Sequence, residues 1–141
     1  MRIALETSET KTDSSAYYEF FYGKWNGEFC GAQSVYLEVS VFELVSPVIE
    51  DKPGFNPYGP GTLSATSARQ IAEELGALSS QVAKADRPQE VWGAQWRGMA
   101  EDLEIESWPP ARKRINAMLR DLTAWFRVAA DSDQVVTVLG L

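Results

Sequence analysis

Residues 17–45 hold the feature that most constrains the fold: two apolar, alternating segments separated by Asn26-Gly27. Asparagine and glycine tolerate the positive φ angles of a type I′ turn, and this pair between apolar runs is the strongest short-range signal of a β-hairpin. The sequence therefore predicts a strand over residues 17–25 and a longer return strand over residues 28–45. We expect the rest of the chain to cover the sheet that this hairpin begins.

The two-residue turn also predicts the strand pairing, with Trp25 opposite Glu28 and Tyr18 opposite Val35. Because side chains alternate along a strand, this register separates two faces. The expected core face is aliphatic and aromatic, with Tyr18, Phe20, Tyr22, Val35, Leu37, Val39 and Val41. The expected outer face mixes rings with carboxylates, in Tyr17, Glu19, Phe21, Trp25, Tyr36, Glu38, Ser40 and Phe42. The alternation fails at residues 42–44, which indicates a bulge or the strand end.

Helical patterns follow a loop at residues 47–61 that is rich in proline and glycine. Ser64 or Ser67 fits the N-cap of a first helix, whose apolar positions recur at helical spacing as far as Val82. A second helical pattern runs from residue 88 to residue 103 and is interrupted by two glycines. A third helix, capped by Ser107, carries a regular apolar stripe. The stripe consists of Ile115, Leu119, Leu122, Phe126 and Ala129.

Two shorter segments complete the predicted sheet. Residues 2–7 alternate weakly and fit a first strand. Residues 135–139 are apolar on both faces, which favours a final strand inside the sheet. Because a chain of 141 residues fits one domain, the sequence predicts a single α+β domain over residues 1–141. In it, an antiparallel hairpin sheet is packed by about three helices and joined by the last strand.

The charge of the chain restricts its partners. The net charge is −7 at pH 7, and an acidic surface repels nucleic acids and anionic lipids. We therefore expect neither nucleic acid nor membrane as a partner, and either a basic partner or a surface that serves solubility. Cys30 is the single cysteine and permits no disulfide within the chain, and no apolar run reaches the length of a membrane span. These features favour a cytoplasmic protein.

The chain offers few groups for catalysis. It has no histidine, which removes the commonest general base and most zinc sites. We therefore expect no enzymatic activity, no cofactor and no bound metal. Two alternatives stay open. One is an enzyme that uses carboxylates or a metal, because Glu19 and Glu38 share a predicted sheet face and four acids lie within residues 101–106. The other is a subunit that assembles into oligomers through a sheet edge.

Two groups of residues are candidates for binding a protein partner. The first is the outer face of the hairpin, where rings lie beside carboxylates in Tyr17, Glu19, Tyr36 and Glu38. Aromatic anchors next to acids suit a cationic partner. The second is the acidic run formed by Glu101, Asp102, Glu104 and Glu106. The plain alternatives are that helices cover the hairpin face and that the acidic run is only a solvated surface.

Three segments together resemble one group of proteins. They are Gly-Phe-Asn-Pro-Tyr-Gly-Pro at residues 54–60, Leu-Arg-Asp-Leu-Thr-Ala-Trp-Phe at residues 119–126, and the apolar ending Val-Val-Thr-Val-Leu-Gly-Leu at residues 135–141. Over residues 54–141 this arrangement resembles small bacterial immunity proteins that accompany polymorphic and contact-dependent growth-inhibition toxins. The resemblance implies a cytoplasmic, non-catalytic inhibitor that binds and neutralises one cognate toxin domain. An acidic inhibitor would be attracted to a basic toxin such as a nuclease.

Overall fold

Five strands form one antiparallel sheet in this protein, for which a computed structural model describes residues 2–12, 16–27 and 33–140. The strands are β1 (Glu6–Thr7), β2 (Tyr17–Tyr22), β3 (Val35–Glu38), β4 (Pro60–Leu63) and β5 (Val136–Leu139). Their order in the sheet is β1-β3-β2-β5-β4, so the last strand returns between β2 and β4. The predicted α+β class and the predicted C-terminal strand within the sheet are both confirmed.

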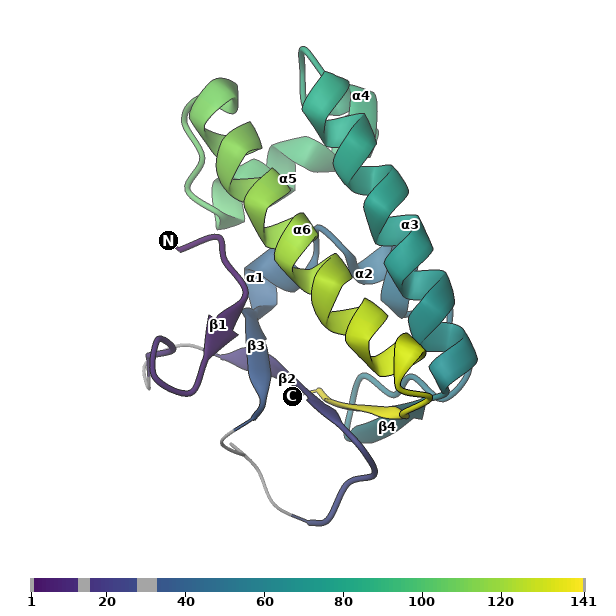
Figure 1. The fold of residues 1–141 in the computed structure, drawn as a ribbon. Coiled ribbons are helices and arrows are strands. Elements are labelled where there is room, and N and C mark those ends of the chain that lie inside the picture. Colours follow the sequence, from purple (N-terminus) through teal and green to yellow (C-terminus); the bar gives the residue numbers. More distant parts are fainter. Residues whose placement is uncertain (1, 13–15, 28–32, 141) are drawn as a thin grey trace.

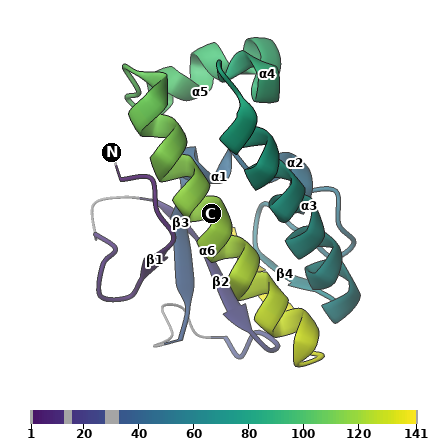
Figure 2. The same ribbon diagram turned by 45° about the horizontal axis from the view of Figure 1, so that its top comes forward.

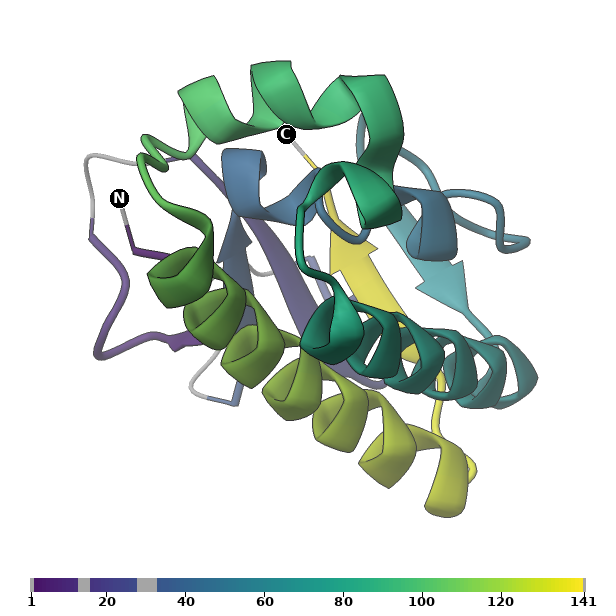
Figure 3. The same ribbon diagram turned by 90° about the horizontal axis from the view of Figure 1, so that it is seen from above.

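Two long helices pack side by side over one face of the sheet (Figures 1 and 2). They are α3 (Ala65–Lys84) and α6 (Trp108–Asp131). A group of short helices lies at one end: α1 (Val39–Phe42), α2 (Ser46–Ile49), α4 (Gln89–Trp92), the 3-10 turn η1 (Gly93–Gln95) and α5 (Trp96–Asp102). Figure 3 shows that α4 and α5 connect the end of α3 to the start of α6 and pass beside α1.

Local sequence signals explain both long helices. The Ser64 side chain caps α3 by accepting a hydrogen bond of 3.0 Å from the backbone amide of Ser67, which satisfies one of the free amides at the helix start. Of the two predicted N-cap candidates, Ser64 and Ser67, Ser64 is therefore the one that caps the helix. Helix α6 begins after Ser107 as predicted, although the Ser107 hydroxyl forms no cap hydrogen bond. Its predicted apolar stripe, from Ile115 to Ala129, is fully buried.

Phe20 lies where the sheet and the helices meet. Its side chain is completely buried, and its ring lies 6.3 Å from that of Phe42, 6.2 Å from that of Trp125 and 6.0 Å from that of Phe126, measured between ring centroids. The neighbouring Tyr22 hydroxyl donates a 2.8 Å hydrogen bond to the backbone carbonyl of Trp125. Aromatic contacts thus join β2, α1 and α6 within the core.

The predicted return strand is wrong beyond Glu38, because the chain turns into α1 and α2 there. A strand would have pointed alternate side chains of residues 41–45 outward. Four of these five side chains are instead buried: Val41, Phe42, Leu44 and Val45. Short helical turns bury adjacent residues more easily than a strand does, and the ring of Phe42 stacks on that of Tyr18 with 3.9 Å between centroids.

The predicted register is also wrong, by two residues. Tyr18 pairs with Leu37 and Phe20 pairs with Val35, and β2 ends at Tyr22, before residue 25. A two-residue turn at Asn26-Gly27 would instead pair Tyr18 with Val35. Within β2 and β3 the sorting of side chains onto two faces survives, because a shift of two residues preserves the period of a strand. The assignment of Phe42 to the outer face is wrong, because Phe42 lies beyond β3 and its buried ring packs on Tyr18 and near Phe20. Glu28, the predicted partner of Trp25, lies outside the described residues, and so does Cys30.

Three further predictions differ from the structure. The first strand is confined to Glu6–Thr7. The predicted loop at residues 47–61 contains most of α2 and ends in the edge strand β4, which pairs with β5 from Pro60 to Leu63. The second predicted helix is divided at Gly93, whose φ angle is 61°. Glycine tolerates that angle, so the chain changes direction there before it starts α5.

Candidate functional site

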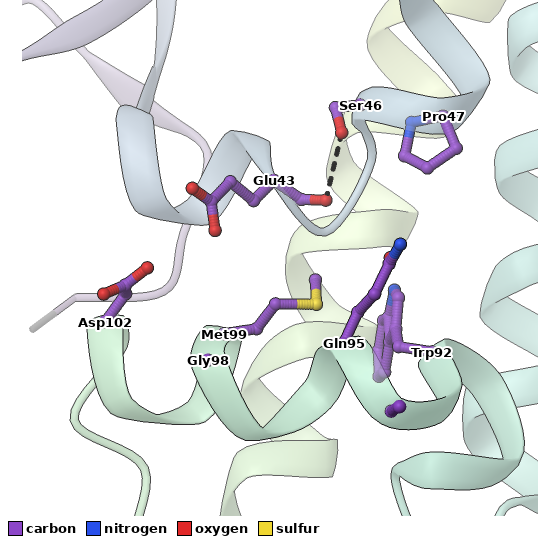
Figure 4. A pocket seen from close by; sticks show the side chains of 9 residues that line it. Glu43, Ser46, Pro47, Trp92, Gln95, Gly98, Met99 and Asp102 are labelled. Carbon is purple, nitrogen blue, oxygen red and sulfur yellow. Dashed lines mark hydrogen bonds between the residues drawn. The ribbon is translucent and has the colours of Figure 1, made fainter.

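A groove of about 450 Å³ separates the corner between α1 and α2 from α4 and α5. Figure 4 shows Glu43 and Pro47 on one wall, and Trp92, Met99 and Asp102 on the other. The lining is mainly apolar. Carboxylates stand at one end of the groove, and the Trp92 ring stands at the other (Figure 4). The groove therefore joins an acidic end to an aromatic end.

Three tryptophans hold the α4–α5 wall in place. The rings of Trp92 and Trp96 stack with 5.2 Å between centroids, and Trp108 packs edge-on against both. Two indole nitrogens donate to backbone carbonyls: Trp92 to Leu44 at 3.3 Å and Trp108 to Ala85 at 3.0 Å. The first of these bonds ties α4 to the α1–α2 corner across the groove. The walls are thus positioned by packing and hydrogen bonding, which favours a groove that exists before any partner binds.

Glu43 and Asp102 bring two negative charges to the same end of the groove (Figure 4). Partial burial raises the pKa of the Glu43 carboxyl, and the negative charge of Asp102 raises it further. Both effects disfavour the charged form of Glu43. A cation placed between the two carboxylates would remove the repulsion, so this end of the groove is suited to a positively charged group.

The negative surface extends from the groove to the end of β3. Burial raises the pKa of the Glu38 carboxyl, and the charges of Glu6 and Glu104 raise it further. The carboxylates of β3 and of the loop after α5 therefore lie close enough to interact. We use the name acidic surface for a set that is exposed or half-exposed: Glu38, Glu43, Glu101, Asp102, Glu104 and Glu106.

The structure divides the predicted binding residues into two groups. Glu101, Asp102, Glu104 and Glu106 are all exposed, as a binding surface requires. On the hairpin, Tyr17 and Glu38 are half-exposed.

The other two hairpin candidates are buried, with exposures of 5% for Glu19 and 2% for Tyr36. These two residues pair directly across β2 and β3, and the Ser34 hydroxyl donates a 2.6 Å hydrogen bond to the Glu19 carboxylate. Glu19 and Tyr36 therefore belong to the interior and offer no contact area to a partner. This corrects their assignment to an exposed hairpin face.

Sequence reasoning missed the groove because it placed Glu43 in a strand. The available signal was the failure of alternation at residues 42–44, which marks Glu43 as the exposed position among buried neighbours. Trp92 and Trp96 stack on each other although Gly93 separates α4 from α5. Their proximity to Glu43 depends on the chain returning over α1 and could not be derived from spacing.

The described part of the chain holds no group of three or more histidine, cysteine or acidic side chains placed to bind a metal ion. Among the helices described, none has the length and apolar character needed to span a membrane. The chain matches no protein family model, no characterised protein and no solved structure in the comparisons made.

The raised pKa values of Glu38 and Glu43 predict how stability depends on pH. In the folded state the pKa of each carboxyl lies above its ordinary value of 4.5, so each binds its proton more tightly than it does in the unfolded chain. Their contribution to stability is therefore present below that pH and is lost as the pH rises through the folded-state values. We expect the double variant Glu38→Gln/Glu43→Gln to lose less stability between about pH 4 and about pH 7, and to be more stable than wild type at about pH 7.

Urea unfolding at several pH values measures this difference. The matched control is Glu73→Gln/Asp121→Asn, which removes two exposed acids from α3 and α6. A control that flattens the pH profile as much as the test variant would show that the net charge, and not the local repulsion, sets the dependence.

Proposed function

We propose that this protein is a non-catalytic inhibitor that binds a basic protein toxin domain, as the resemblance of residues 54–141 to bacterial immunity proteins implies. The observation that carries the proposal is the acidic surface. It gathers acids from β3, the α1–α2 corner and the end of α5, and the pKa values of Glu38 and Glu43 are raised by burial and, further, by neighbouring carboxylates. Holding like charges together is unfavourable for the isolated protein, and a basic partner would reverse that cost.

The acidic surface also suggests how the inhibitor would act. Long-range attraction speeds the encounter of oppositely charged proteins and fixes their orientation. Many basic toxins act on nucleic acids through a positive groove, and an acidic protein seated there would exclude the substrate. We place this action in the cytoplasm, with a protein as the partner and with neither nucleic acid nor membrane bound, because the negative surface repels both.

Capture of the partner tests the proposal. The chain, immobilised and exposed to lysate of its native host, should retain a protein that arrests growth when expressed alone, and co-expression of this chain should restore growth. The variant Glu101→Gln/Asp102→Asn/Glu106→Gln should bind that protein on the order of tenfold more weakly, and raised salt should weaken wild-type binding in the same direction.

The matched control is Glu73→Gln/Asp121→Asn/Asp131→Asn, which removes the same charge from exposed positions on α3 and α6. It should retain nearly full affinity. If no growth-arresting protein depends on this chain for its neutralisation, the proposed function is wrong.

A further inference from the structure

We propose that the groove between the α1–α2 corner and α5 binds an arginine side chain of the partner, with the guanidinium group between the carboxylates of Glu43 and Asp102. This inference rests on the proposed function, because it assigns the kind of residue with which the toxin would enter the groove. The evidence comes from the charge at one end of the groove, the lining along it and the ring at the other end.

The charge at the acidic end has no partner within the described part of the chain. No lysine or arginine among those residues forms an ion pair with Glu43 or Asp102, and the ion pairs of Lys52 are instead with Asp51 and Glu74. The two carboxylates come from separate elements and face the same space (Figure 4). The groove therefore presents two acceptors to one incoming cation.

The shape of the groove favours arginine over lysine. A guanidinium group is planar and carries five donors, so it can bond to two carboxylates at once, whereas an ammonium group is a compact point charge. The half-buried Trp92 ring at the other end offers an aromatic surface to a side chain that neighbours the arginine. Pro47 and Met99 line the space between, where the methylene groups of an arginine stem would be covered.

The volume of about 450 Å³ leaves room for more than the guanidinium group alone. An adjoining apolar side chain of the partner can therefore occupy the Trp92 end while arginine occupies the acidic end. The expected occupant is an exposed segment of a protein in which an arginine is flanked by apolar residues.

Matched peptides test the inference on the full chain. The first probe is acetyl-Gly-Leu-Arg-Leu-Gly-amide; the second carries citrulline, which has the same shape without the charge, and the third carries lysine. In NMR titrations, the arginine peptide should shift the Trp92 indole and Met99 methyl signals. The citrulline peptide should bind about tenfold more weakly, and the lysine peptide should fall between the two.

Variants of the protein locate the binding site. Glu43→Gln/Asp102→Asn should weaken binding of the arginine peptide about tenfold, and Glu73→Gln/Asp121→Asn should leave it unchanged. The inference is overturned if the Trp92 and Met99 signals do not move. It is also overturned if the arginine and lysine peptides bind equally and shift the whole acidic surface, since binding would then be general charge attraction.

The failure of this inference is distinguishable from that of the proposed function. A captured toxin whose affinity is unchanged by Glu43→Gln/Asp102→Asn would leave the inhibitor role intact and place the contact outside the groove. The reverse outcome is that the arginine peptide binds in the groove but no toxin is neutralised by this chain. The groove would then remain an arginine-binding site, and the inhibitor role would be wrong.

Discussion

Replacing Phe20 with alanine is expected to lower the free energy of unfolding by about 3–5 kcal/mol, the usual cost of deleting a buried aromatic ring. Phe20 is fully buried between the sheet and the helices, and its ring contacts rings of α1 and α6. Because these neighbours belong to different elements of the fold, they cannot all move inward to fill the space. A cavity would remain, and its lining would lose dispersion contacts. Urea unfolding followed by circular dichroism measures the loss.

The adjacent phenylalanine supplies the control. Phe21 lies on the same strand with its side chain on the opposite face, where it is only half-buried. We expect Phe21→Ala to cost less than half as much as Phe20→Ala, because the cost of removing a ring scales with the apolar area that leaves water on folding. Equal losses from the two variants would mean that the assignment of faces on β2 is incorrect.

Replacing Gly54 with alanine is expected to destabilise the protein by about 2–4 kcal/mol, through backbone strain and close contact together. The φ angle of Gly54 is +91°, a backbone conformation that residues with a Cβ rarely adopt. An added Cβ would also lie 2.0 Å from the backbone oxygen of Thr62. Thr62 pairs with Thr137 in the sheet, so the loop cannot move away without disturbing β4.

Gly76 is the matched control for Gly54. It lies within α3, and a Cβ added there would have no heavy atom within 4 Å. Gly76→Ala should therefore stabilise the protein by about 1 kcal/mol, because alanine is the better helix former. The contrast between a loss at one glycine and a gain at the other is measured by thermal or urea unfolding. A neutral Gly54→Ala variant would contradict the close approach of this loop to β4.

The loop that contains Gly54 also contacts the C-terminal segment. A Cβ at Gly140 would lie 2.6 Å from the backbone oxygen of Pro57. Two of the three segments on which the resemblance to immunity proteins rests, residues 54–60 and residues 135–141, therefore touch in the fold. This contact gives Gly140 a structural role, because the absence of a Cβ permits the two backbone segments to approach closely.

The sequence by itself determined the elements whose signals are local. Spacing within one segment predicts the helix start at Ser64 or Ser67, the buried stripe of α6 and the two faces of β2, because side-chain periodicity decides what is buried. The exposure of the four acids at residues 101–106 follows in the same way, because charged carboxylates favour water. These predictions needed no knowledge of what packs against each segment.

Only the tertiary structure decided the features that depend on distant partners. The chain leaves the sheet after Glu38 because the helices beside it bury consecutive apolar residues, and β4 forms because β5 offers it an edge. Contacts with distant segments likewise bury Glu19 and place Glu43 at the edge of a groove. Periodicity records which side of a segment is apolar, whereas the position of a charge relative to a groove is set by contacts between segments far apart in the chain.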